Sequence, residues 1–155
     1  MEVFGGGMSV LFAKQKSKLE SVNDINSGLI NLFKIIRDKP ESLSYVLEQM
    51  LISREVFEDI KTKKDAPSND IKRAAYFYYL ISQSFGSKGT HFAMNAKSGR
   101  KPKNLWRNFM TWSKRLHFVT IENLSFEELI KRYDKEDTFF YLDPPYYNYE
   151  KVYTS

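Results

Sequence analysis

Four consecutive residues near the end of the chain, Asp143, Pro144, Pro145 and Tyr146, combine a carboxylate, two prolines and an aromatic ring. They follow an apolar run, residues 138–142, that is typical of a strand. Two prolines remove two amide donors and fix the backbone, so the chain presents rigid carbonyl acceptors beside a carboxylate. We therefore predict that this segment accepts hydrogen bonds from the N–H groups of an amine.

An exocyclic amine such as N6 of adenine is a weak nucleophile because its lone pair is delocalised into the ring. Acceptors on its hydrogens localise that lone pair, which makes the amine more reactive toward an arriving methyl group. Tyr146 would stack on the target base, which an enzyme must take out of the duplex before modifying it. Two other interpretations remain: the Pro-Pro-Tyr segment ends a strand with a core aromatic, or it binds a proline-recognition module.

A glycine triplet near the start of the chain is the second signal. Phe4 ends a short predicted strand, residues 2–4, and Gly5, Gly6 and Gly7 lead into a predicted helix over residues 8–14. Such a turn lets the backbone approach a ligand and aims helix amides at negative charge. A merely tight turn would accept the same glycines.

Asp24 ends the second predicted strand, residues 19–22, and precedes apolar residues at helical spacing. An acidic side chain at this point can accept hydrogen bonds from both hydroxyls of a nucleoside ribose. Asp24 equally suits the start of the following helix, with Asn26 or Ser27 as its N-cap.

Basic residues are concentrated in one segment. Residues 71–121 contain no Asp or Glu but ten Lys or Arg, although the whole chain has a net charge of only +5. An acid-free stretch of this length favours a polyanion partner over a solvated lysine-rich face. Within it, residues 86–103 hold three glycines, a proline and five basic residues, which is typical of a hairpin or mobile loop.

Length and composition exclude several classes of protein. A chain of 155 residues suits one domain with its own core. Without cysteine it can build no disulfide, thiolate nucleophile or cysteine-held zinc site. No apolar run approaches a bilayer span and the start lacks a signal-peptide pattern, so membrane insertion and secretion are not expected.

Predicted strands and helices alternate at both ends of the chain. Helical spacing of apolar residues predicts further helices at residues 25–36, 40–51, 53–63, 71–85, 105–116 and 125–133, and alternation predicts a strand at 117–121. Ser125 and Glu128 form a capping box. This order predicts an α/β fold with a doubly wound parallel sheet. The helical, basic block between Pro40 and Leu116 exceeds what the sheet needs, which indicates an inserted function.

The chain resembles the Dam-type (D12 class) adenine-specific DNA methyltransferases, in which a glycine-rich cofactor motif precedes a recognition region and a DPPY motif. The matching segments are residues 2–7 (EVFGGG), 23–30 (NDINSGLI), 54–57 (REVF), 73–75 (RAA), 123–127 (NLSFE) and 139–147 (FFYLDPPYY). The resemblance implies a Rossmann-like, S-adenosylmethionine-dependent methyltransferase core with a helical, basic target-recognition insertion. Residues 1–39 would start the cofactor-binding core, 40–116 would form the insertion with a basic loop at 86–104, and 117–155 would return to the catalytic core.

The resemblance also implies the role of each matching residue. The cofactor-binding residues would be Phe4, Gly5 and Gly7 at the methionine end, Asp24 at the ribose, Asn123 and Leu124 at the adenine ring, and Asp143. The target amine and base would be held by Asp143, Pro144, Pro145 and Tyr146. The DNA-binding residues would be Lys88, Lys97, Arg100, Lys101, Lys103 and Arg107. The implied reaction is transfer of a methyl group from S-adenosylmethionine to N6 of a flipped adenine in double-stranded DNA, without a metal.

Two departures from the family shape the expectation. The family has a short N-terminal segment with a Lys-containing motif, and further strands and helices after the catalytic loop, so this chain is expected to lack both ends. The alternatives are an inactive fragment with residual DNA binding, and an N-methyltransferase acting on cytosine N4 or on RNA. The resemblance further implies a bacterial or phage-encoded, cytoplasmic enzyme and leaves open a cognate restriction endonuclease as a partner.

Overall fold

The computed structural model describes residues 1–64, 66–84, 86, 88–93, 105 and 107–144. Its helices are α1 (Ser9–Ala13), α2 (Ser27–Asp38), α3 (Pro40–Glu48), α4 (Arg54–Lys61), α5 (Asp70–Gln83), α6 (Met110–Leu116) and α7 (Phe126–Tyr133). Its strands are β1 (Glu20–Asn23) and β2 (Val119–Glu122). Helices and strands are therefore mixed along the chain, as the sequence predicts.

The strands form a parallel arrangement that brings distant parts of the chain together. β1 and β2 pair in parallel, with Glu20 opposite Val119. The start of the chain adds to this pair, because Glu2 forms a parallel bridge to Val22 of β1 and another to Tyr141. The two-stranded sheet is thus extended by isolated bridges, in the order Tyr141 segment, chain start, β1 and β2. Because all four run the same way, their carboxyl ends meet at one edge.

The first and last predicted strands are shorter than the sequence pattern indicates. Residues 2–4 and 138–142 are each represented by a single bridging residue, Glu2 and Tyr141. The amine of Met1 donates to the Phe139 carbonyl oxygen at 2.7 Å, and the Tyr141 amide donates to the Met1 carbonyl oxygen at 2.8 Å, so the two segments lie side by side. A strand's extent depends on the backbone beside it, which hydrophobic alternation does not reveal.

Side-chain caps set the starts of most longer helices. The side chain of Asn26 caps α2, that of Ser53 caps α4 and that of Asn69 caps α5, each by accepting a backbone amide of the first turn. The Ser125 side chain caps α7 by accepting the amide of Glu128 at 3.3 Å. This contact confirms the serine half of the predicted capping box.

One predicted helix is wrong in its start. The sequence pattern indicates a helix over residues 105–116, but α6 begins at Met110. The Asn108 side chain accepts the Met110 amide at 2.9 Å and so satisfies a donor at the start of the helix. β2 also begins two residues later than predicted, because His117 keeps a helical backbone conformation.

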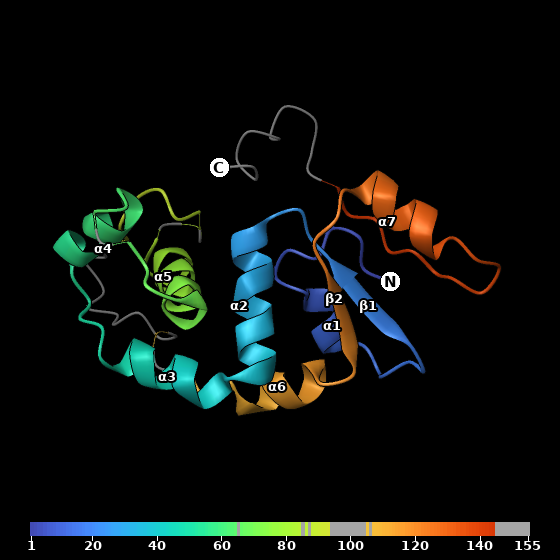
Figure 1. Cartoon of the computed structure of the whole chain (residues 1–155), viewed down its shortest axis with the longest axis horizontal. Helices are drawn as coiled ribbons and strands as arrows, with labels where there is room; N and C mark the ends of the chain where they lie inside the picture. The colour runs from blue at the N-terminus through green and yellow to red at the C-terminus, as the bar shows by residue number, and fades with distance from the viewer. Residues whose placement is uncertain (65, 85, 87, 94–104, 106, 145–155) are drawn as a thin grey trace.

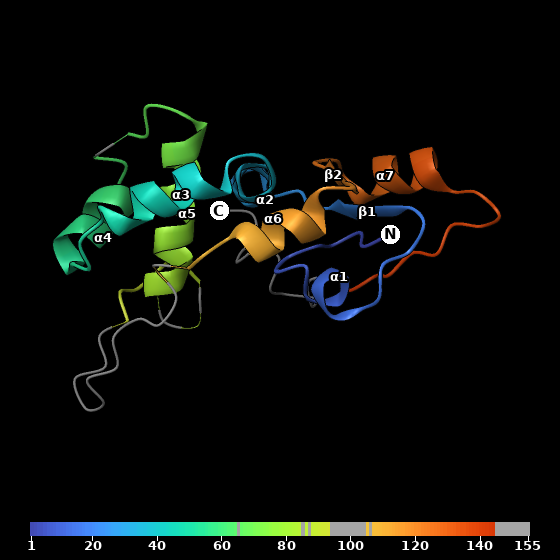
Figure 2. The same cartoon turned by 90° about the horizontal axis from the view of Figure 1, so that it is seen from below.

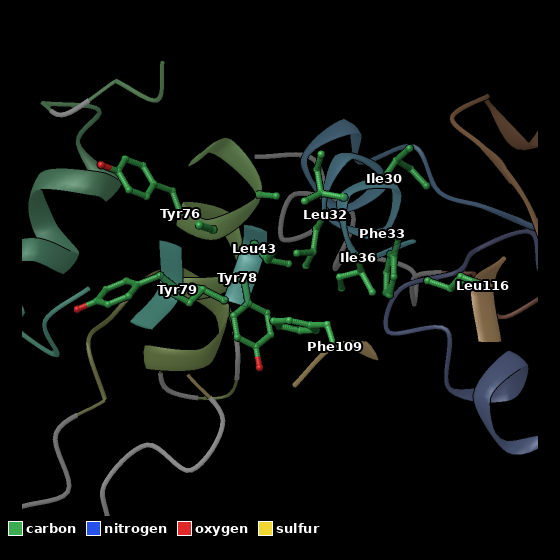
Figure 3. Packing of buried hydrophobic residues seen from close by; sticks show 14 of the residues in the cluster. Ile30, Leu32, Phe33, Ile36, Leu43, Tyr76, Tyr78, Tyr79, Phe109 and Leu116 are labelled. Atoms are coloured by element: carbon green, nitrogen blue, oxygen red, sulfur yellow. The ribbon is translucent and has the colours of Figure 1, made fainter. Parts of the chain in front are cut away.

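The core surrounds α2, which contacts α5, α3, α6 and β2. Figure 3 shows Phe33 and Ile36 of α2 between Phe109 on one side and Leu116 on the other. The rings of Tyr78 and Phe109 meet edge to face with their centroids 5.2 Å apart. Helix α5 is largely buried; its buried residues are Ala74, Ala75, Tyr76, Tyr78, Tyr79 and Gln83.

The helices α3, α4 and α5 gather at one end of the molecule, and the two strands with α7 lie at the other (Figure 1). Helix α2 lies between these groups, and α1 and α7 lie on opposite faces of the strands (Figure 2). Among the residues that the structure describes, no helix is long and apolar enough to cross a membrane.

A half-buried ion pair ties α6 to the start of β1. The guanidinium of Arg115 donates to both carboxylate oxygens of Glu20, at 2.6 and 2.9 Å, and also to the Leu11 carbonyl oxygen at 2.8 Å. Lys14 forms a further ion pair with Glu20. Burial alone would raise the pKa of Glu20, but the hydrogen bonds from Arg115 and Lys14 outweigh it and lower that pKa to about 2.

Candidate active site

The residues predicted to bind the cofactor and the target amine follow the carboxyl ends of the four parallel segments. Phe4 and the glycine triplet follow the chain start, Asp24 follows β1, and Asn123 and Leu124 follow β2. Asp143 and Pro144 come after the Tyr141 bridge and are exposed. Pro145 and Tyr146 lie outside the described residues. The edge of an open parallel sheet is where such folds bind ligands.

Each glycine of the turn meets a different requirement. The Gly5 amide donates to the Asn23 carbonyl oxygen at 2.7 Å, and a Cβ at Gly5 would lie 2.9 Å from that oxygen. Gly6 has a φ of +47°, in the left-handed region that favours glycine. A Cβ at Gly7 would meet nothing within 4 Å, so the backbone of this turn borders open space. The turn is therefore both tight and accessible to a ligand.

Asp24 joins this turn to the start of α2. Its Oδ2 accepts the amide of Gly6 at 2.8 Å, and its Oδ1 accepts the amide of Asn26 at 2.8 Å. The N-cap of α2 is Asn26, whose Oδ1 accepts the Leu29 amide at 3.0 Å. Asp24 therefore supports the helix start without being its cap. Each carboxylate oxygen can accept more than one hydrogen bond, so capacity for two hydroxyl donors remains.

Two asparagines connect the ends of β1 and β2, and sequence reasoning missed one of them. Asn23 is only 2% exposed, and its side-chain amide bonds the backbone of both Val3 and Leu124. The Asn123 side chain donates to the carbonyl oxygens of Asp24 and Ile25 at 2.7 and 3.1 Å. The sequence did contain a signal for Asn23: it is an amide side chain at the end of a predicted strand, and a buried amide needs hydrogen-bond partners.

An aromatic pair lies beside the glycine turn. The rings of Phe4 and Phe126 are tilted by 40° with their centroids 5.8 Å apart. Phe126, the first residue of α7, is 46% exposed. The edge of the sheet thus combines backbone amides, a carboxylate and apolar ring surface, which together suit a nucleoside with an apolar face.

The structure describes two of the six predicted DNA-binding residues. Lys88 is exposed, and the guanidinium of half-buried Arg107 lies 4.6 Å from the centroid of the Trp112 ring. Lys97, Arg100, Lys101 and Lys103 lie outside the described residues.

The acid-free segment also contains basic side chains that pair with polar groups of the protein itself. Arg115 binds Glu20, and Arg73 contacts Asp70 at 3.2 Å and the Asn31 side chain at 2.9 Å. The count of ten basic residues therefore overstates the positive charge available to a polyanion.

The start of the predicted basic loop packs against α4. Ser84 and Phe92 form an antiparallel bridge, and the Phe92 ring meets the Phe57 ring edge to face at 5.5 Å between centroids. The Arg54 guanidinium lies 5.4 Å from the centroid of the Phe92 ring. Gly86 has a positive φ of 63°, as a reversing chain requires. These contacts fit a hairpin at the described base of the loop.

Two open hollows lie on the helical end of the molecule, away from the sheet edge. One of about 340 Å³ is lined by residues of α3 and by Arg107, and one of about 480 Å³ by residues of α3 and α5. Neither includes a residue predicted to bind the cofactor. In the part of the chain that is described, no group of three or more His, Cys, Asp or Glu residues is placed to hold a metal ion.

Comparison with known proteins gives matches that cover all or nearly all of the chain. The sequence pattern of the family described as D12 class N6 adenine-specific DNA methyltransferase matches residues 1–155. The Type II methyltransferase M1.LlaDCHI of Lactococcus lactis subsp. cremoris is 28% identical over 162 residues, which cover 94% of this chain and 55% of that protein. The chain thus spans about half the length of this curated relative.

Proposed function

Because this chain belongs to the D12 class N6 adenine-specific DNA methyltransferase family, we propose that the protein transfers a methyl group from S-adenosylmethionine to N6 of adenine in DNA. The single observation that carries the proposal is the contact between Asp24 and the glycine turn. The carboxylate after β1 accepts the Gly6 amide at 2.8 Å, so the acid proposed to bind the ribose lies beside the glycine turn at the sheet edge.

The residues at this edge fit S-adenosylmethionine. Asp24 retains acceptor capacity for ribose hydroxyls, and Gly7 borders open space where a methionine tail can lie against backbone. Phe4 supplies a ring surface nearby, and Leu124 follows β2 with its backbone held by the Asn23 side chain. The bound cofactor supplies an electrophilic methyl group. We assign Phe4, Gly5, Gly7, Asp24, Asn123, Leu124 and Asp143 to its site, within a Rossmann-like sheet.

Asp143, Pro144, Pro145 and Tyr146 act on the target base in this proposal. The Asp143 carboxylate and the proline-fixed carbonyl oxygens accept hydrogen bonds from the amine, and these bonds localise the lone pair on its nitrogen. Tyr146 stacks on the flipped adenine. Asp143 follows the bridging residue Tyr141, so it leaves the sheet at the edge that Asp24 occupies. No group with metal-ligand chemistry is required for this reaction.

Residues 40–116 form the target-recognition part in this proposal, and residues 1–39 and 117–155 form the catalytic core. The loop 86–104 and Arg107 contact the duplex, with phosphates held by basic side chains. The Type II name of the Lactococcus relative suggests a restriction endonuclease as a partner system. The family membership supports the cytoplasm as the proposed place of action, for a bacterial or phage-encoded enzyme.

The test is incubation of the protein with methyl-labelled S-adenosylmethionine and a duplex of mixed sequence, followed by mass spectrometry of the nucleosides. Labelled N6-methyladenine is the expected product, and Asp143→Ala should abolish it. Labelled N4-methylcytosine, or label in RNA alone, would replace the proposal with the corresponding alternative. Absence of cofactor binding by calorimetry, together with absence of label, would identify a relic of the family.

A further inference from the structure

The side chain of Asn23 is nearly enclosed and fully engaged. Its Nδ2 donates to the Val3 carbonyl oxygen at 3.0 Å and to the Leu124 carbonyl oxygen at 3.1 Å, and its Oδ1 accepts the Leu124 amide at 2.8 Å. Both donors and an acceptor are thus paired with backbone, which fixes the orientation of the amide. This one side chain joins the end of the chain start to the loop after β2.

Asn123 makes the reverse connection. It follows β2, and its Nδ2 donates to the carbonyl oxygens of Asp24 and Ile25 after β1. Each asparagine therefore forms hydrogen bonds with the backbone just after the other one: Asn23 with Leu124, and Asn123 with Asp24 and Ile25. Bonds within the sheet hold β1 and β2 only as far as Asn23 and Glu122. Beyond that point, the two side chains hold the diverging loops together.

We propose that Asn23 is a positioning residue for the nucleoside half of the cofactor, with Asn123 as its weaker counterpart. The inference rests on the proposed function, because it takes Asp24 as the ribose acceptor and Leu124 as a neighbour of the adenine ring. The reciprocal bonds set the separation between these two groups before any ligand arrives. A site arranged in advance avoids the loss of affinity that comes from ordering loops on binding.

The relative strengths of the two residues follow from their burial. Asn23 is 2% exposed, so removal of its side chain leaves the buried Val3 carbonyl oxygen and the half-buried amide and carbonyl oxygen of Leu124 without their partner. Asn123 is exposed, so water can replace its two bonds. Asn23 substitutions should therefore have the larger effect.

The experiment compares Asn23→Ala, Asn123→Ala and a matched control, Asn31→Ala, in the complete chain. Asn31 is 7% exposed, donates to the Asp70 carbonyl oxygen at 3.0 Å and accepts from Arg73, but it joins α2 to α5 away from the sheet edge. Calorimetry gives the Kd of adenosine and of S-adenosylmethionine, urea denaturation gives stability, and amide hydrogen exchange reports on Leu124 without ligand.

We expect Asn23→Ala to raise both Kd values by roughly tenfold, the effect of about one lost buried hydrogen bond. Equal effects on the two ligands locate the change at their shared nucleoside. The Leu124 amide should exchange faster than in the wild type. Asn31→Ala should be destabilised comparably, with unchanged Kd values and unchanged exchange at Leu124. Asn123→Ala should raise both Kd values by roughly twofold to threefold, in line with a water-accessible bond.

Normal adenosine binding by folded Asn23→Ala, or equal losses in Asn23→Ala and Asn31→Ala, would overturn the inference. If Asn23→Ala does not fold, Asn123→Ala decides, because an exposed substitution leaves the core intact, and unchanged binding there would also overturn it. Failure of the wild type to bind S-adenosylmethionine would refute the proposed function instead. The Leu124 exchange rates would still show whether Asn23 holds that loop.

Discussion

Acid should destabilise the protein through Glu20, and the effect can be isolated with one substitution. The Glu20 side chain is 7% exposed and pairs with Arg115, which is 13% exposed. Its pKa is about 2 in the folded protein, against an ordinary value of 4.5. Because the folded-state pKa is the lower one, the ionised form stabilises the fold. This stabilisation is complete above pH 4.5 and is lost as the pH falls toward 2.

The magnitude follows from linkage. A pKa lowered from 4.5 to about 2 contributes about 3 kcal/mol to the free energy of unfolding at neutral pH, of which about 2 kcal/mol is lost by pH 3. Urea denaturation of the wild type and Glu20→Gln at pH 7 and pH 3 measures this loss. The other carboxylates titrate in both proteins, so their contributions cancel in the comparison. Wild type should therefore lose about 2 kcal/mol more than Glu20→Gln between the two pH values.

Glu58→Gln is the matched control. Glu58 pairs with Lys61 at 3.5 Å, but its side chain is 45% exposed, and exposed pairs contribute little to stability. Its stability difference between pH 7 and pH 3 should equal that of the wild type. If Glu20→Gln also loses as much stability as the wild type, the ion pair does not stabilise the fold and the reasoning from its burial is wrong.

Four further outcomes follow from the proposed site. Asp143→Ala should abolish methyl transfer while cofactor affinity stays within a few-fold, and retained turnover would remove Asp143 from the catalytic set. Asp24→Ala should weaken S-adenosylmethionine binding by about 1 to 3 kcal/mol, measured by calorimetry, with DNA affinity unchanged in the absence of cofactor. Gly5→Ala should cost about 1 to 3 kcal/mol of stability, since its Cβ would lie 2.9 Å from a backbone oxygen, and a normal urea midpoint would contradict that steric argument. Replacing both Lys101 and Lys103, which lie outside the described residues, with Ala should reduce the log-log salt slope of duplex binding by roughly 2 in fluorescence anisotropy. An unchanged slope would mean that neither lysine contacts a phosphate.

Local patterns located most of the helices, because their signals lie within a few residues of each boundary. The predicted cap residue Ser125 precedes apolar residues at helical spacing, and it caps α7 in the structure. The predicted start of α6 was wrong because the Asn108 side chain accepts the Met110 amide. This local hydrogen bond competes with helix formation, and hydrophobic periodicity carries no information about it. The family followed from motifs, and its match to residues 1–155 confirms it.

The sequence by itself determined the types of residue available at the site, because glycine turns, acids and prolines have intrinsic chemistry at any location. Only the tertiary structure decided how they combine. The bond from Gly6 to Asp24 spans 18 residues, and the bonds between Asn23 and Leu124 span 101. The periodicity of apolar residues along the chain cannot predict contacts across such separations. Those contacts depend on which parallel segments become neighbours, and that choice is made by packing of the whole core around α2, where burial of apolar surface far outweighs any single hydrogen bond.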